Sequence, residues 1–210
     1  MDANDWDSRY DETDLRWSRG PNRWIAEITA DLPPGRVLDL AAGEGRNAIW
    51  LAERGWHATA VDFSAVALQR ATRIAAERLG EGVTRFSVRQ ADLATYTPDP
   101  RSYDLVLVVY LQVESALRSQ VLRAAADAVA TGGSLVVTAH DTRNTELGYG
   151  GPPDPAVLYS AGDVTSDIDG SGLDVQRAEL VTRVVDTPDG TRNALDCLVV
   201  ATRPRTDSAH

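Results

Sequence analysis

The sequence predicts an α/β fold: a doubly wound, mostly parallel seven-stranded sheet that ends in an antiparallel hairpin and carries helices on both faces. Two observations predict this class. From residue 36 onward, short apolar runs alternate with segments of helical periodicity, as they do in strand–helix units that feed a parallel sheet. Near the C-terminus, strand patterns at 173–185 and 193–203 are separated only by the turn-forming segment 186–192, so these strands must pair antiparallel.

The first half of the chain holds four expected strands, at 36–40, 57–63, 84–92 and 103–111. The last of them scarcely alternates between apolar and polar residues, which is typical of a strand buried on both faces. Helices are expected at 45–55 and 65–80, because apolar residues recur there at helical spacing. Gly55 and Gly80 supply their C-terminal stops, and Ser64 is expected to cap the start of the second helix.

The second half continues with an alanine-rich helix at 114–130 and a fifth strand at 134–140. The stretch 141–160 is rich in glycine and proline and contains the sequence GYGGPPDP, so a long loop is expected there. This loop either forms a wall of a binding site or is a solvent-exposed loop that lines no site. A short helix at 161–170 precedes the closing hairpin.

The length of 210 residues and a hydrophobic content of 43% suit one domain with appendages. We expect that domain at 33–203, after an aromatic-rich arm at 1–32 and before a flexible tail at 204–210. The arm holds three of the five tryptophans, Trp6, Trp17 and Trp24. It either folds over the site as a lid or covers an exposed part of the fold.

The acidic composition bounds the partners of the chain. A formal net charge of −10 and a pI near 4.7 disfavour nucleic acid and an anionic membrane surface. The longest apolar run, 105–111, is too short to span a bilayer, and the N-terminus lacks the pattern of a signal peptide, so a cytoplasmic monomer or homodimer is expected. The single cysteine, Cys197, excludes an internal disulfide and lies in a strand pattern, which favours a packed residue. No metal site is expected.

A glycine-rich loop follows the first expected strand, in the segment VLDLAAGEGRNAIW at 37–50. Its spacing also fits the dinucleotide pattern G-x-G-x-x-A, at Gly43, Gly45 and Ala48. Asp39 ends the strand and Glu44 lies within the loop, so two carboxylates would oppose a pyrophosphate there. A cationic ligand would not be opposed.

The segment VLDLAAGEGRNAIWLAERGWHATAVDFS, at 37–64, resembles the first two motifs of the class I S-adenosylmethionine-dependent methyltransferases. The resemblance extends over 36–139, and Ala41 stands where the family's first glycine is common. It implies a Rossmann-like fold, S-adenosylmethionine as cofactor and a methyl transfer. The sequences WDSRY and GGPPDP further resemble the small-molecule branch that includes thiol, thiopurine and tellurite methyltransferases.

The resemblance implies a set of cofactor-binding residues: Asp39, Ala41, Gly43, Gly45, Asp62, Phe63, Asp92, Leu93 and Val109. Asp39 would hold the loop and the ammonium group of the cofactor. The two oxygens of Asp62 can accept hydrogen bonds from both ribose hydroxyls, and Phe63 offers a flat face for adenine. Asp92 and the Leu93 amide would contact the adenine edge. Each carboxylate has an alternative interpretation as a helix or loop cap.

On the acceptor side, an in-line displacement at the sulfonium methyl requires above all that both reactants be held in line. Tyr110 and His140, at the ends of two expected strands, are the candidate catalytic residues. Gln112, with Tyr10 and Trp17 of the arm, would line the pocket for a thiol, chalcogen, phenol or quinone acceptor. Tyr110 and His140 have alternative interpretations as packed and edge residues. Two other functions stay open, a nicotinamide-dependent oxidoreductase and a non-catalytic nucleoside-binding module.

Overall fold

The computed structural model describes residues 20–205, so the predicted pocket residues Tyr10 and Trp17 lie outside the described residues. A seven-stranded sheet has the order β3-β2-β1-β4-β5-β7-β6. The first three strands are parallel, and β7 pairs antiparallel with both of its neighbours. The predicted α/β class with a closing antiparallel hairpin is therefore confirmed.

The chain divides into two compact units. Of the described residues, the first unit comprises 20–97 with Ser102–Leu107, and the second comprises Pro98–Arg101 with 108–205. Strand β4, Tyr103–Val109, contributes residues to both units.

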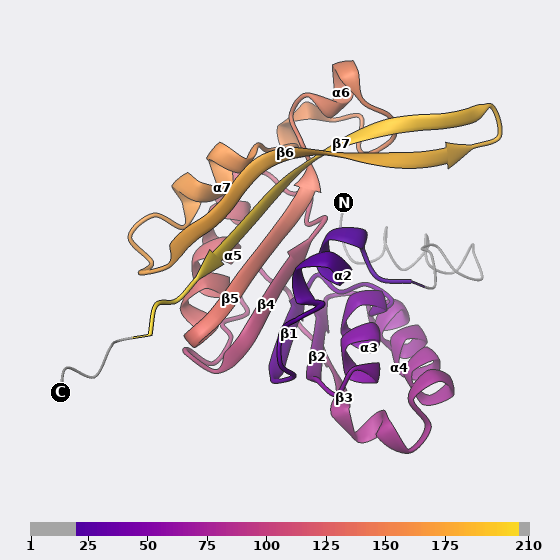
Figure 1. The fold of residues 1–210 in the computed structure, drawn as a ribbon, viewed down its shortest axis with the longest axis vertical. Helices are drawn as coiled ribbons and strands as arrows, with labels where there is room; N and C mark the ends of the chain where they lie inside the picture. Colours follow the sequence, from indigo (N-terminus) through magenta and orange to yellow (C-terminus); the bar gives the residue numbers. More distant parts are fainter. Residues whose placement is uncertain (1–19, 206–210) are drawn as a thin grey trace. The chain divides into compact units, whose positions relative to one another are not determined.

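The first unit places two helices against three parallel strands (Figure 1). Leu38 of β1 pairs with Thr59 of β2, which pairs in turn with Ser87 of β3. Ser64 accepts a hydrogen bond from the Ala67 amide at 3.0 Å, so the predicted cap of the second of these helices is confirmed. In chain order the elements are α2 (Arg23–Thr29), β1 (Arg36–Leu40), α3 (Arg46–Glu53), β2 (His57–Asp62), α4 (Ala65–Leu79), η1 (Gly80–Arg85) and β3 (Phe86–Gln90).

Helix α2 shows how the described part of the predicted arm packs. Trp24 and Ile25 of this helix are buried. The Asn22 side chain caps it by accepting from the Trp24 amide at 2.8 Å, and the Asn22 amide donates to Asn47 Oδ1 of α3 at 2.8 Å. Residues 20–32 are thus anchored to the first unit by an apolar face and a buried polar contact.

The second unit is built around a long antiparallel hairpin (Figure 1, orange and yellow). Strands β6 and β7 pair from Asp174↔Thr202 to Thr187↔Gly190, with a register shift between Val175 and Arg177. Helices α5 and α7 pack against each other and against these strands and β5. After β4 the elements are α5 (Ser115–Ala128), β5 (Val129–His140), α6 (Asn144–Leu147), η2 (Pro155–Val157), α7 (Ala161–Asp167), β6 (Asp174–Thr187) and β7 (Gly190–Thr202).

Three predicted boundaries differ from the structure. The helix predicted at 114–130 ends at Ala128, because Val129 adopts extended backbone and starts β5 five residues earlier than predicted. The third strand is shorter than predicted, since the 3₁₀ helix η1 occupies Gly80–Arg85. The turn predicted at 186–192 shrinks to the two residues between the Thr187↔Gly190 pair, because polar side chains fit an exposed hairpin as well as a loop.

The structure also bears on the predictions about the single cysteine and about membrane-spanning segments. Cys197 is fully buried in β7, and burial raises the pKa of its thiol to about 12, so the prediction of a packed, unreactive cysteine is confirmed. Among residues 20–205, none of the helices is both long and apolar enough to cross a bilayer.

Candidate functional site

The loop after β1 has an unusual backbone. Ala41, Gly43 and Gly45 all have positive φ, at 57°, 55° and 74°. Positive φ is disfavoured for a residue with a Cβ, so Ala41 carries a strain of roughly 1 kcal/mol that the surrounding structure sustains. The turn is closed by the Gly45 amide, which donates to the Ala42 carbonyl at 2.9 Å. Three alternate residues thus adopt left-handed backbone at the positions where the sequence predicts contact with a cofactor.

Asp39 lies beneath this loop, at the end of β1, and is 1% exposed. Among the described residues neither carboxylate oxygen has a hydrogen-bond partner of good geometry. Burial raises the pKa of Asp39 to about 7, a rise that the Ala48 amide and the charge of Arg46 limit and the nearby Asp62 increases. A buried carboxylate without a partner is costly, and a cationic group such as the ammonium of S-adenosylmethionine would remove that cost.

Asp62 joins the ends of β1 and β2. Its Oδ2 accepts from the Gly43 amide at 2.8 Å, and its Oδ1 accepts from the Ser64 amide at 2.9 Å. The predicted alternative, a loop-capping carboxylate, is thus part of what Asp62 does. Each carboxylate oxygen can accept a second hydrogen bond, so these contacts are compatible with a ribose diol.

Glu44 has a different environment from the one that its sequence position suggests. It is 4% exposed and forms an ion pair with Arg70 of α4 at 3.3 Å. Its negative charge is therefore offset within the protein. The electrostatic argument against a pyrophosphate therefore rests on the buried carboxylate of Asp39.

The end of β3 brings in the remaining predicted adenine contacts. Gln90 Nε2 donates to the Phe63 carbonyl at 3.1 Å, and the Ala91 amide donates to the Asp62 carbonyl at 2.9 Å. Asp92 is exposed, and its Oδ1 accepts from the Ala94 amide at 2.9 Å, as its predicted alternative as a turn cap requires. Leu93 and Phe63 are half-buried. Hydrogen bonds thus connect the carboxyl ends of β1, β2 and β3, where open sheets bind ligands.

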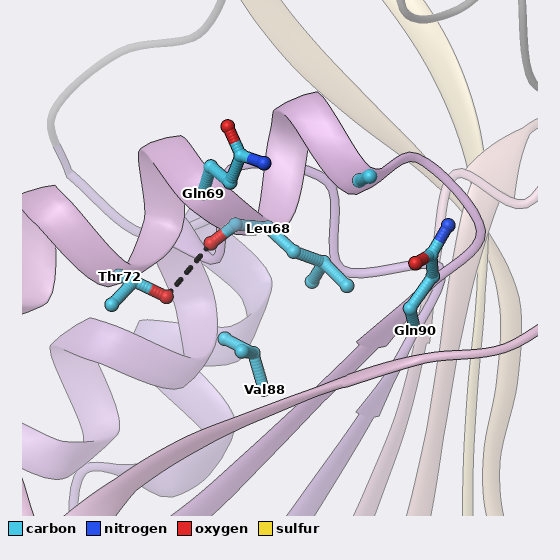
Figure 2. Close-up of a pocket in the computed structure, with 6 residues that line it drawn as sticks. Leu68, Gln69, Thr72, Val88 and Gln90 are labelled. Carbon is cyan, nitrogen blue, oxygen red and sulfur yellow. Dashed lines mark hydrogen bonds between the residues drawn. The ribbon is translucent and has the colours of Figure 1, made fainter.

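A shallow hollow of the first unit lies between α4 and β3 (Figure 2). In Figure 2 the Leu68 and Val88 side chains lie between the helix and the strand, and Gln90 stands at the end of the strand. Its lining residues are Ala65, Leu68, Gln69, Thr72, Val88 and Gln90. None of the predicted cofactor residues lines it, although Gln90 connects it to Phe63.

The second unit contains a buried polar cluster around Tyr110 and His140. Tyr110 has a φ of 57°, and its hydroxyl donates to Asp196 Oδ2 of β7 at 2.7 Å. Arg183 Nε of β6 donates to the same Asp196 oxygen at 2.9 Å and to the Tyr110 hydroxyl at 3.0 Å. Nδ1 of His140 lies 3.3 Å from Asp196 Oδ1, and the Tyr110 and His140 rings are 5.0 Å apart between centroids.

The environment of Tyr110 assigns its hydroxyl a donor role. Burial, and next the negative charge of Asp196, raise the pKa of Tyr110 well above its usual value. The hydroxyl therefore stays protonated and donates to Asp196.

Gln112 and Val109 complete the predicted set. Gln112 Oε1 accepts from the His140 amide at 3.0 Å, and its Nε2 donates to the Val157 carbonyl at 2.6 Å. Both ends of this side-chain amide are therefore used to hold His140 and the turn at Val157. Val109 is the last residue of β4 and is 8% exposed.

Sequence reasoning missed Asp196 and Arg183. The signal for Asp196 was present, because a charged residue interrupts the apolar run ALDCLVVA at 194–201. A charge in a buried strand requires partners. No comparable signal marks Arg183, which lies in a strand of alternating burial that carries several exposed charges.

Comparison with known proteins shows which family this part of the chain is similar to. Residues 37–133 match a family model described as a methyltransferase domain. Over these residues the chain is similar to class I methyltransferase domains. S-adenosylmethionine is the cofactor of that class, and the buried, unpaired carboxylate of Asp39 fits its ammonium group. The matched segment begins in β1 and ends within β5.

Two curated relatives match part of this chain. Glycine N-methyltransferase of Oryctolagus cuniculus is 30% identical over 176 residues, 76% of this chain and 59% of the relative. The 2-heptyl-1-hydroxyquinolin-4(1H)-one methyltransferase of Mycobacteroides abscessus is 30% identical over 109 residues, 51% of this chain and 47% of the relative. The chain thus spans about half to three fifths of the length of these relatives.

A solved structure shows the same fold over nearly the whole length of this chain. It comes from a study of the conversion of a disulfide bond into a thioacetal group during echinomycin biosynthesis. Its TM-score is 0.75 at 20% identity, with 98% of this chain and 94% of that chain covered.

Within residues 20–205, no group of three or more His, Cys, Asp or Glu side chains is placed to hold a metal ion.

Proposed function

We propose that this chain transfers a methyl group from S-adenosylmethionine to a small-molecule acceptor. The observation that carries the proposal is Asp39, a fully buried carboxylate without a hydrogen-bond partner among the described residues, beneath a loop of small residues. Such a site disfavours an anionic ligand and favours one with a cationic amino acid end. Both curated relatives are named for small-molecule acceptors, glycine and a hydroxyquinolinone.

Different residues of the first unit would bind different parts of the cofactor. Asp39 would bind the ammonium group, while the bare backbone at Gly43 and Gly45 would allow the amino acid end to come close. Asp62 would accept hydrogen bonds from the ribose hydroxyls, because a carboxylate oxygen that accepts one backbone hydrogen bond can accept a second. Phe63 would stack on adenine, with Asp92 and the Leu93 amide at its edge.

When bound, S-adenosylmethionine supplies an electrophilic methyl group on a sulfonium, and the chain has to supply position and shelter from water. The acceptor is a thiol, a chalcogen compound, a phenol or a quinone-type molecule, as the sequence suggests. The acidic surface, with a net charge of −10, favours such acceptors over nucleic acid.

Turnover with a radiolabelled methyl donor tests the proposal. The full chain would be incubated with a panel of thiols, phenols, quinones and chalcogen oxyanions, and label in the acceptor would be counted. Transfer to at least one small molecule is expected. Binding of S-adenosylhomocysteine without transfer to any acceptor of the panel would favour a nucleoside-binding module, and reduction or oxidation of a substrate with NAD would favour an oxidoreductase.

Asp62→Ala is expected to weaken the binding of S-adenosylhomocysteine by on the order of 1 to 3 kcal/mol, because the ribose hydroxyls lose a charged acceptor. Isothermal calorimetry would measure the affinity, and circular dichroism would show that the variant is folded. Asp31→Ala, which removes an exposed carboxylate of the same unit, is the matched control. Equal affinities of the two variants would contradict the role given to Asp62.

A further inference from the structure

We propose that the ion pair between Arg70 and Glu44 fixes the loop at 41–45 in the shape that accepts the amino acid end of S-adenosylmethionine. Arg70 is thereby a specificity-determining residue for ligands that carry this end. The inference rests on the proposed function and concerns a residue outside the predicted cofactor contacts. Arg70 acts through Glu44 and not on the reacting atoms, so it is a positioning residue. Both residues belong to the first unit.

The end of β2 holds the first half of this loop. The Ala42 amide donates to the Val61 carbonyl at 3.0 Å. The Gly43 amide donates to Asp62 Oδ2 at 2.8 Å. The other oxygen of Asp62 accepts from the Ser64 amide at 2.9 Å, directly before α4. One carboxylate thus connects the loop to β2 and to the start of α4.

Helix α4 holds the second half of the loop. Arg70 Nη1 lies 3.3 Å from Glu44 Oε1, and the two side chains are only 16% and 3% exposed. The next residue of the helix, Ala71, faces Gly45 of the loop. An added Cβ on Gly45 would lie 3.2 Å from Ala71 Cβ and 3.4 Å from Phe86 Cζ. Two consecutive residues of α4 therefore support two consecutive residues of the loop.

The backbone of the loop requires such support. Ala41, Gly43 and Gly45 all have positive φ, and a residue with a Cβ, such as Ala41, persists in this region where its surroundings fix it. A loop that is ordered before the ligand arrives has already lost conformational entropy, so binding requires less further ordering. The Arg70–Glu44 pair therefore strengthens the binding of a group that contacts residues 43–45. In the proposed function this group is the amino acid end of the cofactor.

The charge of Arg70 acts in the same direction. The amino acid end of S-adenosylmethionine carries a carboxylate beside its ammonium group. Glu44 is 4% exposed and lies in the loop that this end would approach, so without Arg70 its charge would repel the ligand carboxylate more strongly. Asp39 then remains the carboxylate that meets the ammonium group. The adenosine end would bind at Asp62 and Phe63, so the loss of Arg70 should change the preference between ligands with and without an amino acid end.

A pair of ligands tests this preference. Calorimetry with the full chain would measure the affinities for S-adenosylhomocysteine and for 5′-methylthioadenosine, which lacks the amino acid end. Arg70→Met is expected to weaken the binding of S-adenosylhomocysteine about tenfold, as if roughly one more residue had to be ordered, and to change the affinity for 5′-methylthioadenosine less than about twofold. Equal losses with both ligands, or no loss with S-adenosylhomocysteine, would overturn the proposal. Failure of the unmodified chain to bind S-adenosylhomocysteine would instead contradict the proposed function.

Arg78→Met is the matched control. Arg78 pairs with Glu53 at 2.7 Å, so this variant also removes an arginine of α4 from an ion pair, here at the C-terminal ends of α3 and α4. The pair is more exposed than the one at Glu44, with side chains 26% and 28% exposed. Both affinities should stay within about twofold of those of the unmodified protein. An equal loss of S-adenosylhomocysteine binding in Arg78→Met would assign the effect to a general weakening of α4 and would overturn the proposal.

The double variant Arg70→Met with Glu44→Gln separates positioning from stability. Arg70→Met alone removes a charge that offsets a buried carboxylate, so its midpoint of urea unfolding should fall. In the double variant the midpoint should recover because the carboxylate is gone. The loop stays untethered, however, so the Gly45 amide of the unliganded protein should exchange faster with solvent. S-adenosylhomocysteine should still bind several-fold more weakly.

Arg70→Lys keeps the charge at this position and should restore most of the affinity that Arg70→Met loses. A double variant that binds S-adenosylhomocysteine as tightly as the unmodified protein would overturn the proposal, because the ion pair would then serve stability alone. This outcome can be read even if Arg70→Met alone fails to fold.

Discussion

Replacing Asp39 with asparagine is expected to stabilise the unliganded protein while weakening its binding of S-adenosylhomocysteine. The pKa of Asp39 is about 7 in the folded protein against an ordinary value of 3.8, so burial disfavours the ionised form. The free energy of unfolding therefore falls as the pH rises from about 4 to about 7. Above pH 7 it is lowered by the full cost of burying the ionised carboxylate. Asparagine has the same shape without the charge. At pH 8 we expect a gain of about 1 to 3 kcal/mol in the free energy of unfolding.

The same substitution removes the charged acceptor for the cofactor ammonium. Affinity for S-adenosylhomocysteine should fall by about 1.5 to 3 kcal/mol, roughly 10- to 150-fold. Urea unfolding at pH 4 and pH 8 measures the first effect, and calorimetry measures the second. Asp31→Asn, at an exposed site of the same unit, should change neither. A variant that is less stable at pH 8, or that binds as tightly as the unmodified protein, would contradict the role of Asp39.

Arg118→Met is expected to destabilise the second unit by about 3 kcal/mol. Arg118 Nε donates to Asp167 Oδ2 at 2.6 Å, with side chains only 9% and 12% exposed. Removing one partner of a buried ion pair leaves the other charge unpaired, which is the costly outcome. The guanidinium also lies 5.0 Å from the centre of the Tyr159 ring, and Tyr159 is fully buried. The substitution therefore removes a packing contact as well as a charge.

The double variant Arg118→Met with Asp167→Asn separates the two contributions. Because the orphaned carboxylate is gone, it should recover part of the loss, on the order of 1 to 2 kcal/mol. Arg123→Met removes only a hydrogen bond to the Asp167 carbonyl, so it should lower the free energy of unfolding less than the single Arg118 variant or the double variant does. Circular dichroism during urea unfolding provides the free energies. A single variant as stable as the unmodified protein would show that the pair contributes nothing.

Periodicity was sufficient to predict the strands and the helices α3, α4, α5 and α7 in order, but it did not reveal the short helices α2 and α6. It could not place ends that depend on backbone conformation. Val129 is apolar in either element, and only its extended backbone shows that β5 begins there. The polar residues around Pro188 suggested a long turn, but they remain paired through Thr187↔Gly190.

Some residues of the candidate site could likewise be predicted from the sequence, and others could not. Residues that follow one strand, such as Asp39 and Gly43, could be predicted because their spacing along the chain defines the loop. The cluster around His140 depends on the register of β5 against β7, where His140 pairs with Asp196. Register depends on the packing of the whole sheet, so sequence reasoning identified His140 without its partner.

Calorimetric titration of the full chain with S-adenosylhomocysteine, and separately with NAD, tests the central claim that a buried carboxylate selects a cationic nucleoside. The account predicts binding of S-adenosylhomocysteine that strengthens by up to about tenfold between pH 6 and pH 8, because Asp39 must be ionised to hold the ammonium group. In Asp39→Asn this pH dependence should disappear. Tight binding of NAD with no heat from S-adenosylhomocysteine would contradict the account.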